Sequence, residues 1–192
     1  MKVTLIEGQM CNVFLIECSK TIVVDAGANV EEILKLTKKV DFIFLTHCHF
    51  DHIYYLNDYI SAFKGCKIVL GENGVEKLKD NQLNGSAIFE IPLNVDVDES
   101  LLLTKKEGDC LEIEEENVFL ELFGHTNCSL GLKIQNYLFS GDVIFNDGIG
   151  RYDLPTGSFE QTIQTQKRLR ELQDIDFVCC GHGTCPFNLK IN

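Results

Sequence analysis

A dense cluster of metal-binding side chains follows an apolar run in the first third of the chain. Residues 46–52 read Thr-His-Cys-His-Phe-Asp-His, and residues 42–45 before them predict a buried strand. Neutral imidazole and carboxylate are the usual protein ligands of zinc and iron, so three histidines and an aspartate in so short a span predict a metal site. The fold must place this cluster where a strand ends and the chain turns.

The spacing inside the cluster predicts how its ligands are arranged. His47 and His49 stand two residues apart and are expected to face the same way on leaving a strand. Asp51 and His52 follow in the turn that opens a helix. Two pairs of ligands can therefore address two neighbouring metal ions.

The two remaining histidines and one aspartate each follow a predicted strand. His125 stands in Gly-His-Thr, Asp142 in Ser-Gly-Asp and His182 in Gly-His-Gly, each after an apolar run. Glycine lets the backbone turn closely at such points, and ligands collect outside the carboxyl ends of strands in open sheets. An isolated histidine of this kind is more often structural, but strand ends that together deliver every histidine of the chain predict one site.

The rest of the chain reads as short strands with few helices. The predicted strands span residues 3–6, 13–16, 21–24, 42–45, 67–70, 87–91, 101–103, 111–113, 118–122, 130–134, 137–139 and 177–180, of which the first three form an antiparallel meander. The predicted helices span residues 30–39 with Asn29 as cap, a segment from the metal cluster to Phe63, residues 73–79, and residues 159–172 with Ser158 as cap. Asp25 is expected to be a cap, a turn former or a partner for a histidine. No linker interrupts the pattern, so one domain over residues 1–192 is predicted.

Charge and hydropathy exclude several classes of partner. The formal net charge is −12, whereas nucleic acid binding depends on clustered Lys and Arg, so we expect no nucleic acid partner. No apolar run approaches the roughly 20 residues that span a bilayer, so no membrane partner is expected. The first residues alternate like a strand and lack the pattern of a secretory leader. We therefore expect a cytoplasmic protein that starts at Met1 and acts on a small-molecule substrate.

The chain carries nine cysteines, an odd number. Without a secretory leader, free thiols in a reducing cytosol are expected. No two cysteines stand in a Cys-x-x-Cys arrangement, which argues against a closed structural zinc site, so most are expected to be small buried apolar side chains. Cys48 and Phe50, between the predicted ligands, are expected to face away into the packing.

The cluster, with Asp25-Ala26-Gly27 near the start and Gly181-His182-Gly183 near the end, resembles the metallo-β-lactamase-fold superfamily and, within it, the hydroxyacylglutathione hydrolase (glyoxalase II) group. The resemblance implies an α+β fold, a four-layer αββα sandwich with the site at one edge. It also implies that His47, His49 and His125 bind one metal, that Asp51, His52 and His182 bind the other, and that Asp142 bridges them. Zinc is the first expectation for both ions, with iron or manganese as alternatives.

The resemblance implies hydrolysis of a small thioester. Even one zinc lowers the pKa of a bound water to about 7, and the resulting metal-bound hydroxide can attack an acyl carbonyl. The metals stabilise the developing oxyanion, while Asp51 holds its metal and orients the nucleophile. A thiolate leaving group needs little acid assistance, which fits a thioester.

Residues 148–157 resemble the Gly-Arg-x-Asp-Leu-Pro-x-Gly segment of short, bacterial-type glyoxalase II-like proteins. In that family a basic residue at the position of Arg151 contacts the carboxylate-bearing thiol carrier, and an arginine there can clamp a carboxylate with two hydrogen bonds. The alternative is a turn in which Arg151 pairs with Asp153.

The chain also departs from the family pattern. Ile53 and Tyr54 replace a common Gly-Gly, and Cys128 stands where glycine is common, changes expected to narrow the space near the site. Only ten residues follow His182, so the C-terminal helical domain that binds glutathione in classical glyoxalase II is not expected. Alternative functions are a mononuclear iron persulfide dioxygenase, a lactone hydrolase, and a metal-loaded binding module without turnover.

Overall fold

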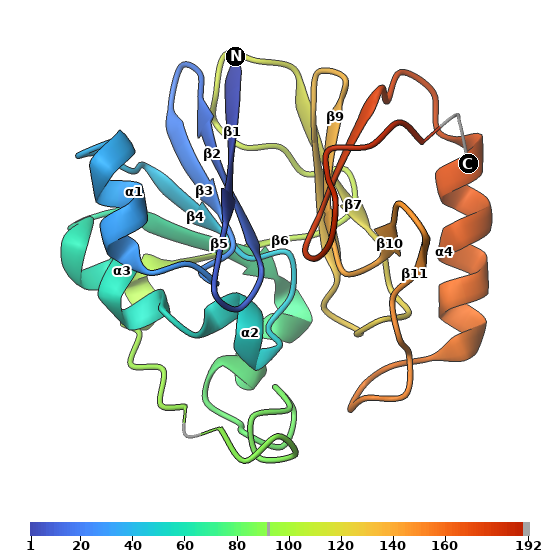
Figure 1. Cartoon of the computed structure of the whole chain (residues 1–192), viewed down its shortest axis with the longest axis horizontal. Coiled ribbons are helices and arrows are strands. Elements are labelled where there is room, and N and C mark those ends of the chain that lie inside the picture. The colour runs from blue at the N-terminus through green and yellow to red at the C-terminus, as the bar shows by residue number, and fades with distance from the viewer. Residues whose placement is uncertain (92, 190–192) are drawn as a thin grey trace.

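The computed structural model describes residues 1–91 and 93–189, and its main strands form two sheets packed face to face (Figure 1). The first sheet has the order β1 (Lys2–Glu7), β2 (Asn12–Glu17), β3 (Thr21–Val24), β4 (Phe42–Phe44), β5 (Lys67–Gly71) and β6 (Leu102–Lys105). The second has the order β12 (Phe177–Cys180), β9 (Tyr137–Gly141), β8 (Leu130–Ile134) and β7 (Asn117–Glu121). Strands β1 to β3 form the predicted antiparallel meander, and β3 to β6 are parallel.

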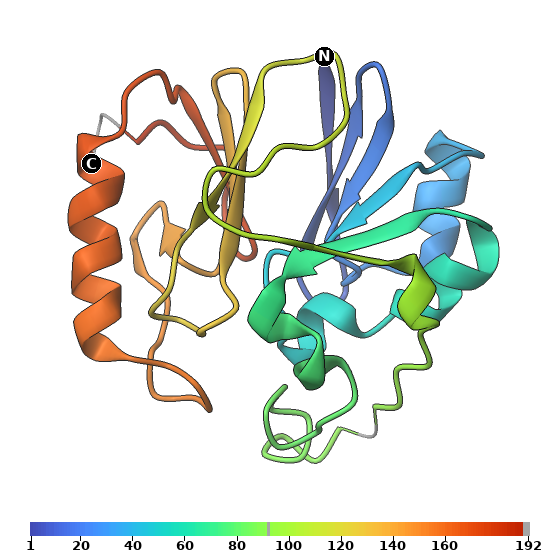
Figure 2. The same ribbon diagram turned by 180° about the vertical axis from the view of Figure 1, so that it is seen from behind.

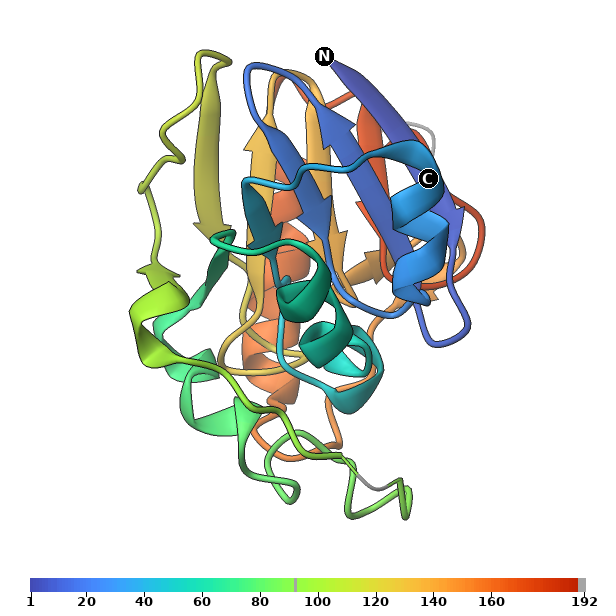
Figure 3. The same cartoon turned by 90° about the vertical axis from the view of Figure 1, so that its left-hand side faces the viewer.

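Helices cover the outer faces of both sheets. The first sheet is covered by the helices α1 (Val30–Leu36), α2 (Phe50–Ile53) and α3 (Leu56–Ala62). The second sheet is covered by α4 (Phe159–Glu171). Figure 3 looks through the layers, with α1 and α3 in front of the first sheet and α4 behind the second. This arrangement confirms the expected α+β fold, a four-layer αββα sandwich. No helix of the described residues is long and apolar enough to cross a membrane.

The hydrophobic core is built from strands that carry apolar side chains on both faces. In β2, Val13 and Leu15 pack toward the helices, whereas Phe14 and Ile16 pack toward the second sheet. Between the sheets the ring of Phe14 meets that of Phe139 edge to face, with centroids 5.6 Å apart. Full burial of such a side chain contributes about 1.5–3 kcal/mol, so strands that read as unbroken apolar runs are stable only between two covering layers.

Two predicted strands are wrong. Residues 87–91 run instead through successive turns, whose backbone hydrogen bonds stay within residues 81–91. Residues 111–113 form a bend because the side chain of Asn117 takes the place of a partner strand. Its Oδ1 accepts a hydrogen bond from the Leu111 backbone N–H at 2.7 Å, and its Nδ2 donates to the Leu111 carbonyl at 3.3 Å.

The predicted helices begin at the expected residues but several end early. Asn29 and Ser158 cap α1 and α4 as predicted, but α1 ends at Leu36 because Thr37 adopts an extended backbone. The helix predicted to reach Phe63 is broken after Ile53. There the His52 carbonyl accepts a hydrogen bond from the Ala26 N–H at 2.8 Å, and so does not bond within the helix. Residues 73–79 form two 3₁₀ turns, Glu72–Gly74 and Glu76–Leu78, and the two-residue strands β10 (Ile144–Phe145) and β11 (Gly148–Ile149) were too short to predict.

All nine cysteines are free thiols, as expected, and seven of them are buried.

The predicted site lies at one end of the sandwich. The strands β4, β9 and β12 all end there, and Figures 1 and 2 show α2 and the segment that follows β5 at this same end. The loops that follow these strands are therefore close in space although they are far apart in the sequence.

Candidate metal centre

The seven predicted ligands converge at this end of the sandwich. Four of them follow β4 in the chain, and the others follow β7, β9 and β12. They form two groups whose ligand atoms lie within 4.8 Å of one another: His47, His49 and His125 in one, and Asp51, His52, Asp142 and His182 in the other. The structure thus brings the seven predicted residues together, with Asp142, the predicted bridging residue, in the second group.

The first group is a set of three buried imidazoles. His47 Nε2 lies 3.1 Å from His49 Nδ1 and 3.1 Å from His125 Nε2. Burial and the neighbouring imidazoles hold the pKa of His47 well below its usual range and lower the pKa of His49 to about 3. Burial lowers the pKa of His125 as well. The three rings are therefore neutral at neutral pH, which is the form that binds a metal ion.

The second group is rich in carboxylate. His182 Nε2 lies 3.1 Å from Asp51 Oδ2 and 3.2 Å from Asp142 Oδ2, and His52 Nε2 lies 3.2 Å from Asp142 Oδ1. Burial alone raises the pKa of Asp142, but His52 and His182 outweigh it and hold this pKa well below the usual range. Asp142 Oδ2 is also 3.9 Å from His125 Nε2, so this carboxylate stands between the two groups.

The residues present fit two divalent metal ions. His52 Nε2 and Asp142 Oδ1 are buried and are among the described side-chain atoms that make no hydrogen bond, although they face each other. A buried polar atom without a partner costs about 1–3 kcal/mol, which coordination to a metal would offset. Imidazole nitrogen with carboxylate oxygen is a borderline donor set that suits zinc, iron or manganese.

The buried side chain of Asp25 contacts the loop that carries His47 and His52 and fixes its orientation. Asp25 Oδ2 lies 2.8 Å from His52 Nδ1, and Asp25 Oδ1 accepts a hydrogen bond from the Thr46 backbone N–H at 2.8 Å. Thr46 Oγ1 is in turn 3.2 Å from His47 Nδ1. The predicted role as a histidine partner is therefore the one that the structure shows, and the Asp25 backbone has a positive φ of 62°. Such partners fix the ring orientation and the tautomer of a ligand histidine.

Glycines allow the loops to approach the ligands this closely. A Cβ added to Gly181 would collide with Asp142 Oδ1 and come within 2.6 Å of His52 Cε1. A Cβ on Gly124 would come within 2.5 Å of the Thr162 backbone in α4, and Gly124 has a φ of 136°, which strongly favours glycine. Space therefore requires glycine at position 181, and space and backbone conformation together require it at position 124.

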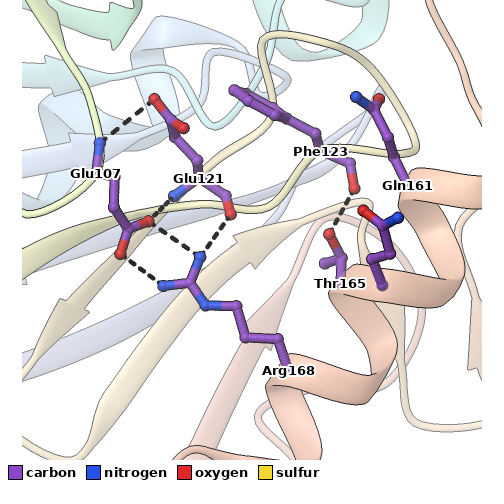
Figure 4. Close-up of a pocket in the computed structure, with 7 residues that line it drawn as sticks. Glu107, Glu121, Phe123, Gln161, Thr165 and Arg168 are labelled. Atoms are coloured by element: carbon purple, nitrogen blue, oxygen red, sulfur yellow. Dashed lines mark hydrogen bonds and ion pairs between the residues drawn. The ribbon is translucent and has the colours of Figure 1, made fainter.

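Helix α4 holds the loop of His125 in place. Thr165 Oγ1 donates a hydrogen bond to the Phe123 carbonyl at 2.6 Å, as Figure 4 shows. Beside this contact Arg168 donates to both carboxylate oxygens of Glu107, at 3.0 and 2.6 Å, and to the Glu121 carbonyl at 3.1 Å. The hollow of about 270 Å³ drawn in Figure 4 is lined by none of the predicted ligands. Its contacts fasten α4 to the end of β7.

A different hollow opens onto the metal ligands. It has a volume of about 300 Å³ and is also lined by Phe50, Asn84, Phe89 and Leu154. The prediction that Phe50 faces away was wrong, because its ring lines this hollow with its centroid 5.1 Å from that of Phe89. Cys48 is buried as predicted. Asn84 and Phe89 were missed because the segment that carries them has no regular periodicity and was partly taken for a strand.

Arg151 lies at the same hollow, and its side chain is half exposed. Its Nε and Nη2 donate to Asp153 Oδ1 and Oδ2 at 2.8 and 2.9 Å, which is the ion pair of the alternative interpretation. Its backbone carbonyl accepts from His125 Nδ1 at 2.7 Å. The backbone at Arg151 thus positions a predicted ligand, whereas substrate binding by the guanidinium remains a prediction.

Comparison with known proteins agrees with this geometry. The family model described as the metallo-beta-lactamase superfamily matches residues 6–182. The chain belongs to this superfamily. It is 34% identical over 193 residues to a metallo-hydrolase of Methanocaldococcus jannaschii, covering 92% of this chain and 89% of that protein. It is 31% identical over 180 residues to hydroxyacylglutathione hydrolase 1 of Vibrio vulnificus, covering 92% of this chain and 63% of that protein. The crystal structure of the B3 metallo-beta-lactamase BLEG-1 superimposes with a TM-score of 0.84 at 26% identity, covering 95% of this chain and 92% of that one.

A proton on His182 is expected to compete with metal. Burial lowers the pKa of His182, but hydrogen bonds to Asp142 and Asp51 outweigh it and raise this pKa to about 9. The proton stabilises the metal-free fold below pH 6.5, and this contribution is lost as the pH rises through about 9. Metal binding needs the neutral ring and must release the proton. We therefore expect the apparent metal affinity of the metal-free protein to rise between these pH values. Competition with a chelating dye measures it, and an affinity independent of pH would contradict the arrangement.

Proposed function

We propose that this chain is a dinuclear metal-dependent hydrolase of small thioesters. The observation that carries the proposal is the complete set of seven ligand side chains in two adjoining groups, five of which line one small cavity. A volume of about 300 Å³ suits a small acyl group and part of its carrier. The similarity to proteins named metallo-hydrolase and hydroxyacylglutathione hydrolase supports the same reaction class.

When bound, two divalent ions would activate a water and polarise the acyl carbonyl. His47, His49 and His125 would hold one ion, Asp51, His52 and His182 the other, and Asp142 both. Burial raises the pKa of Asp51, but His52 and His182 outweigh it and keep this carboxyl ionised, so it can accept a hydrogen bond from the attacking water. The leaving thiolate needs no general acid. Among the described residues that line the cavity, Arg151 is the only titratable side chain besides the predicted metal ligands.

A panel of substrates on protein of known metal content tests the proposal. We expect two metal ions per chain, zinc before iron or manganese, and turnover of small thioesters. Lactones, β-lactams and glutathione persulfide serve as the other members of the panel. One iron per chain with oxygen uptake on the persulfide would favour a dioxygenase and overturn the hydrolase, and bound metal without turnover of any substrate would favour a binding module.

Arg151 is proposed to bind a carboxylate on the thiol carrier. Its ion pair with Asp153 is half exposed and worth little, so a substrate carboxylate can replace Asp153. We expect Arg151→Ala to raise KM about tenfold for thioesters whose carrier bears a carboxylate, since a hydrogen bond to a charged group contributes about 1.5–3 kcal/mol. Because only the Arg151 carbonyl touches His125, kcat should stay nearly unchanged. Initial rates with carriers that have or lack a carboxylate measure the effect.

The matched variant is Asp153→Ala, which removes the competing partner and should lower KM for the carboxylate-bearing carriers. An equal rise in KM for both kinds of carrier in Arg151→Ala would show that the guanidinium acts on the loop and not on the substrate.

A further inference from the structure

Two cysteines flank the loop that carries His182. Residues 180–185 read Cys-Gly-His-Gly-Thr-Cys, and the chain reverses within them. The reversal is antiparallel, because Val178 N–H donates to the Phe187 carbonyl at 2.8 Å and Phe187 N–H donates to the Val178 carbonyl at 3.1 Å. Cys180 and Cys185 lie on the two arms of this reversal and are in contact, because the Cys185 thiol donates a hydrogen bond to the Cys180 carbonyl at 3.5 Å.

Opposite residues of an antiparallel pair have the separation that a disulfide needs. Their Cα atoms lie about 4.5–5.5 Å apart, and disulfides form at Cα separations of about 4.4–6.8 Å. The contacts of the two cysteines are consistent with such a separation. Cys185 Sγ lies 3.5 Å from the Cys180 carbonyl, and Asn12 Nδ2 donates to that carbonyl at 3.2 Å and to Cys185 Sγ at 3.3 Å. The Asn12 side chain therefore holds the two cysteines together.

The two thiols differ in access. Cys185 is 8% exposed and lines an open cavity of about 360 Å³ together with Leu5, Glu7 and Thr184, whereas Cys180 is completely buried. Hydrogen bonding with Cys180 lowers the pKa of the Cys185 thiol, which favours its reactive form. An incoming reagent can thus reach Cys185 first and leave Cys180 to complete the exchange.

We propose that Cys180 and Cys185 form a reversible disulfide with a low-molecular-weight disulfide as the oxidant. The Cys185 sulfur attacks one sulfur of the reagent, whose sulfur–sulfur bond breaks and releases one thiol. The Cys180 sulfur then attacks Cys185, closes the intramolecular disulfide and releases the second thiol. The two protons lost by the cysteines end on the two released thiols, so the protein is oxidised by two electrons and the reagent is reduced by two.

This modification acts on the metal centre through the loop. In the reduced protein the Cys180 thiol donates a hydrogen bond to the His182 carbonyl at 3.1 Å, and His182 faces Asp51 and Asp142. Oxidation removes the proton of that hydrogen bond. We expect the oxidised loop to hold His182 less well and the protein to bind its second metal at least several-fold more weakly. The consequence for turnover rests on the proposed function, but the disulfide and the metal affinity do not.

The test treats the folded, metal-loaded protein with glutathione disulfide, alkylates the remaining thiols and maps disulfide-linked peptides by mass spectrometry. The expected result is a Cys180–Cys185 link that a reducing agent removes, with a parallel loss of metal measured by elemental analysis. Cys185→Ser should abolish the link and make metal content insensitive to the reagent. Cys110→Ser, which removes the exposed cysteine, should behave as wild type.

Mixed disulfides at Cys110 or Cys18 without a Cys180–Cys185 link would overturn the proposal, as would a link that leaves metal content unchanged. A protein that forms the link and loses metal, but hydrolyses no thioester before treatment, would contradict the proposed function alone.

Discussion

Asp142→Ala is expected to leave at most one metal ion per chain and to reduce thioester hydrolysis on the order of a thousandfold. Asp142 faces His52 and His182 at 3.2 Å and His125 at 3.9 Å, so it is the side chain that both ligand groups share. Metal ions supply several kcal/mol of transition-state stabilisation, and each 1.36 kcal/mol corresponds to a factor of ten in rate. Elemental analysis of the purified variant and kcat/KM for a small thioester measure the two effects.

The matched control is Asp147→Ala, which removes the same charge from an exposed position in the neighbouring hairpin. It should retain two metal ions and wild-type rates. If Asp142→Ala kept both ions and full activity, the assignment of the bridging position and the dinuclear mechanism would fail together.

Gly181→Ala is expected to disrupt the metal centre without changing any ligand. The added methyl group would overlap Asp142 Oδ1 and press on His52 Cε1 at 2.6 Å, so it must displace a member of the carboxylate group. Changes to residues that only orient metal ligands lower metal affinity or activity by about 10–100-fold, and we expect an effect at the upper end of this range. Metal affinity from dye competition and thioesterase rates provide the measurement, with the thermal unfolding midpoint of the metal-free protein as a check on folding.

Gly148→Ala is the control for this variant, because a Cβ there meets no atom within 4 Å and Gly148 has no positive φ. It should match wild type in both measurements. Wild-type metal affinity in Gly181→Ala would mean that the loop of His182 can move away from Asp142 at little cost.

The sequence predicted the metal-binding residues because they stand in short motifs that are unusual in composition. Residues 46–52 are unusual in composition, and the glycines beside His125, Asp142 and His182 mark turns after apolar strands. Prediction failed where a residue far away in the sequence makes the hydrogen bond that was expected from a neighbouring segment. The side-chain amide of Asn117 hydrogen-bonds to the Leu111 backbone in place of a partner strand. The Ala26 N–H donates a hydrogen bond to the His52 carbonyl, which interrupts the predicted helix. No periodicity within a segment reveals such long-range partners.

The sequence by itself determined the kind of chemistry, because the identity and spacing of the histidines and aspartates specify a metal-binding donor set whatever the exact fold. Only the tertiary structure decided that Phe50 and Phe89 line the cavity, that Arg151 is paired with Asp153, and that Cys185 contacts Cys180. These relations depend on how separate loops pack at one end of the sandwich. Loop packing is set by contacts between segments far apart in the chain, and a linear pattern does not contain them.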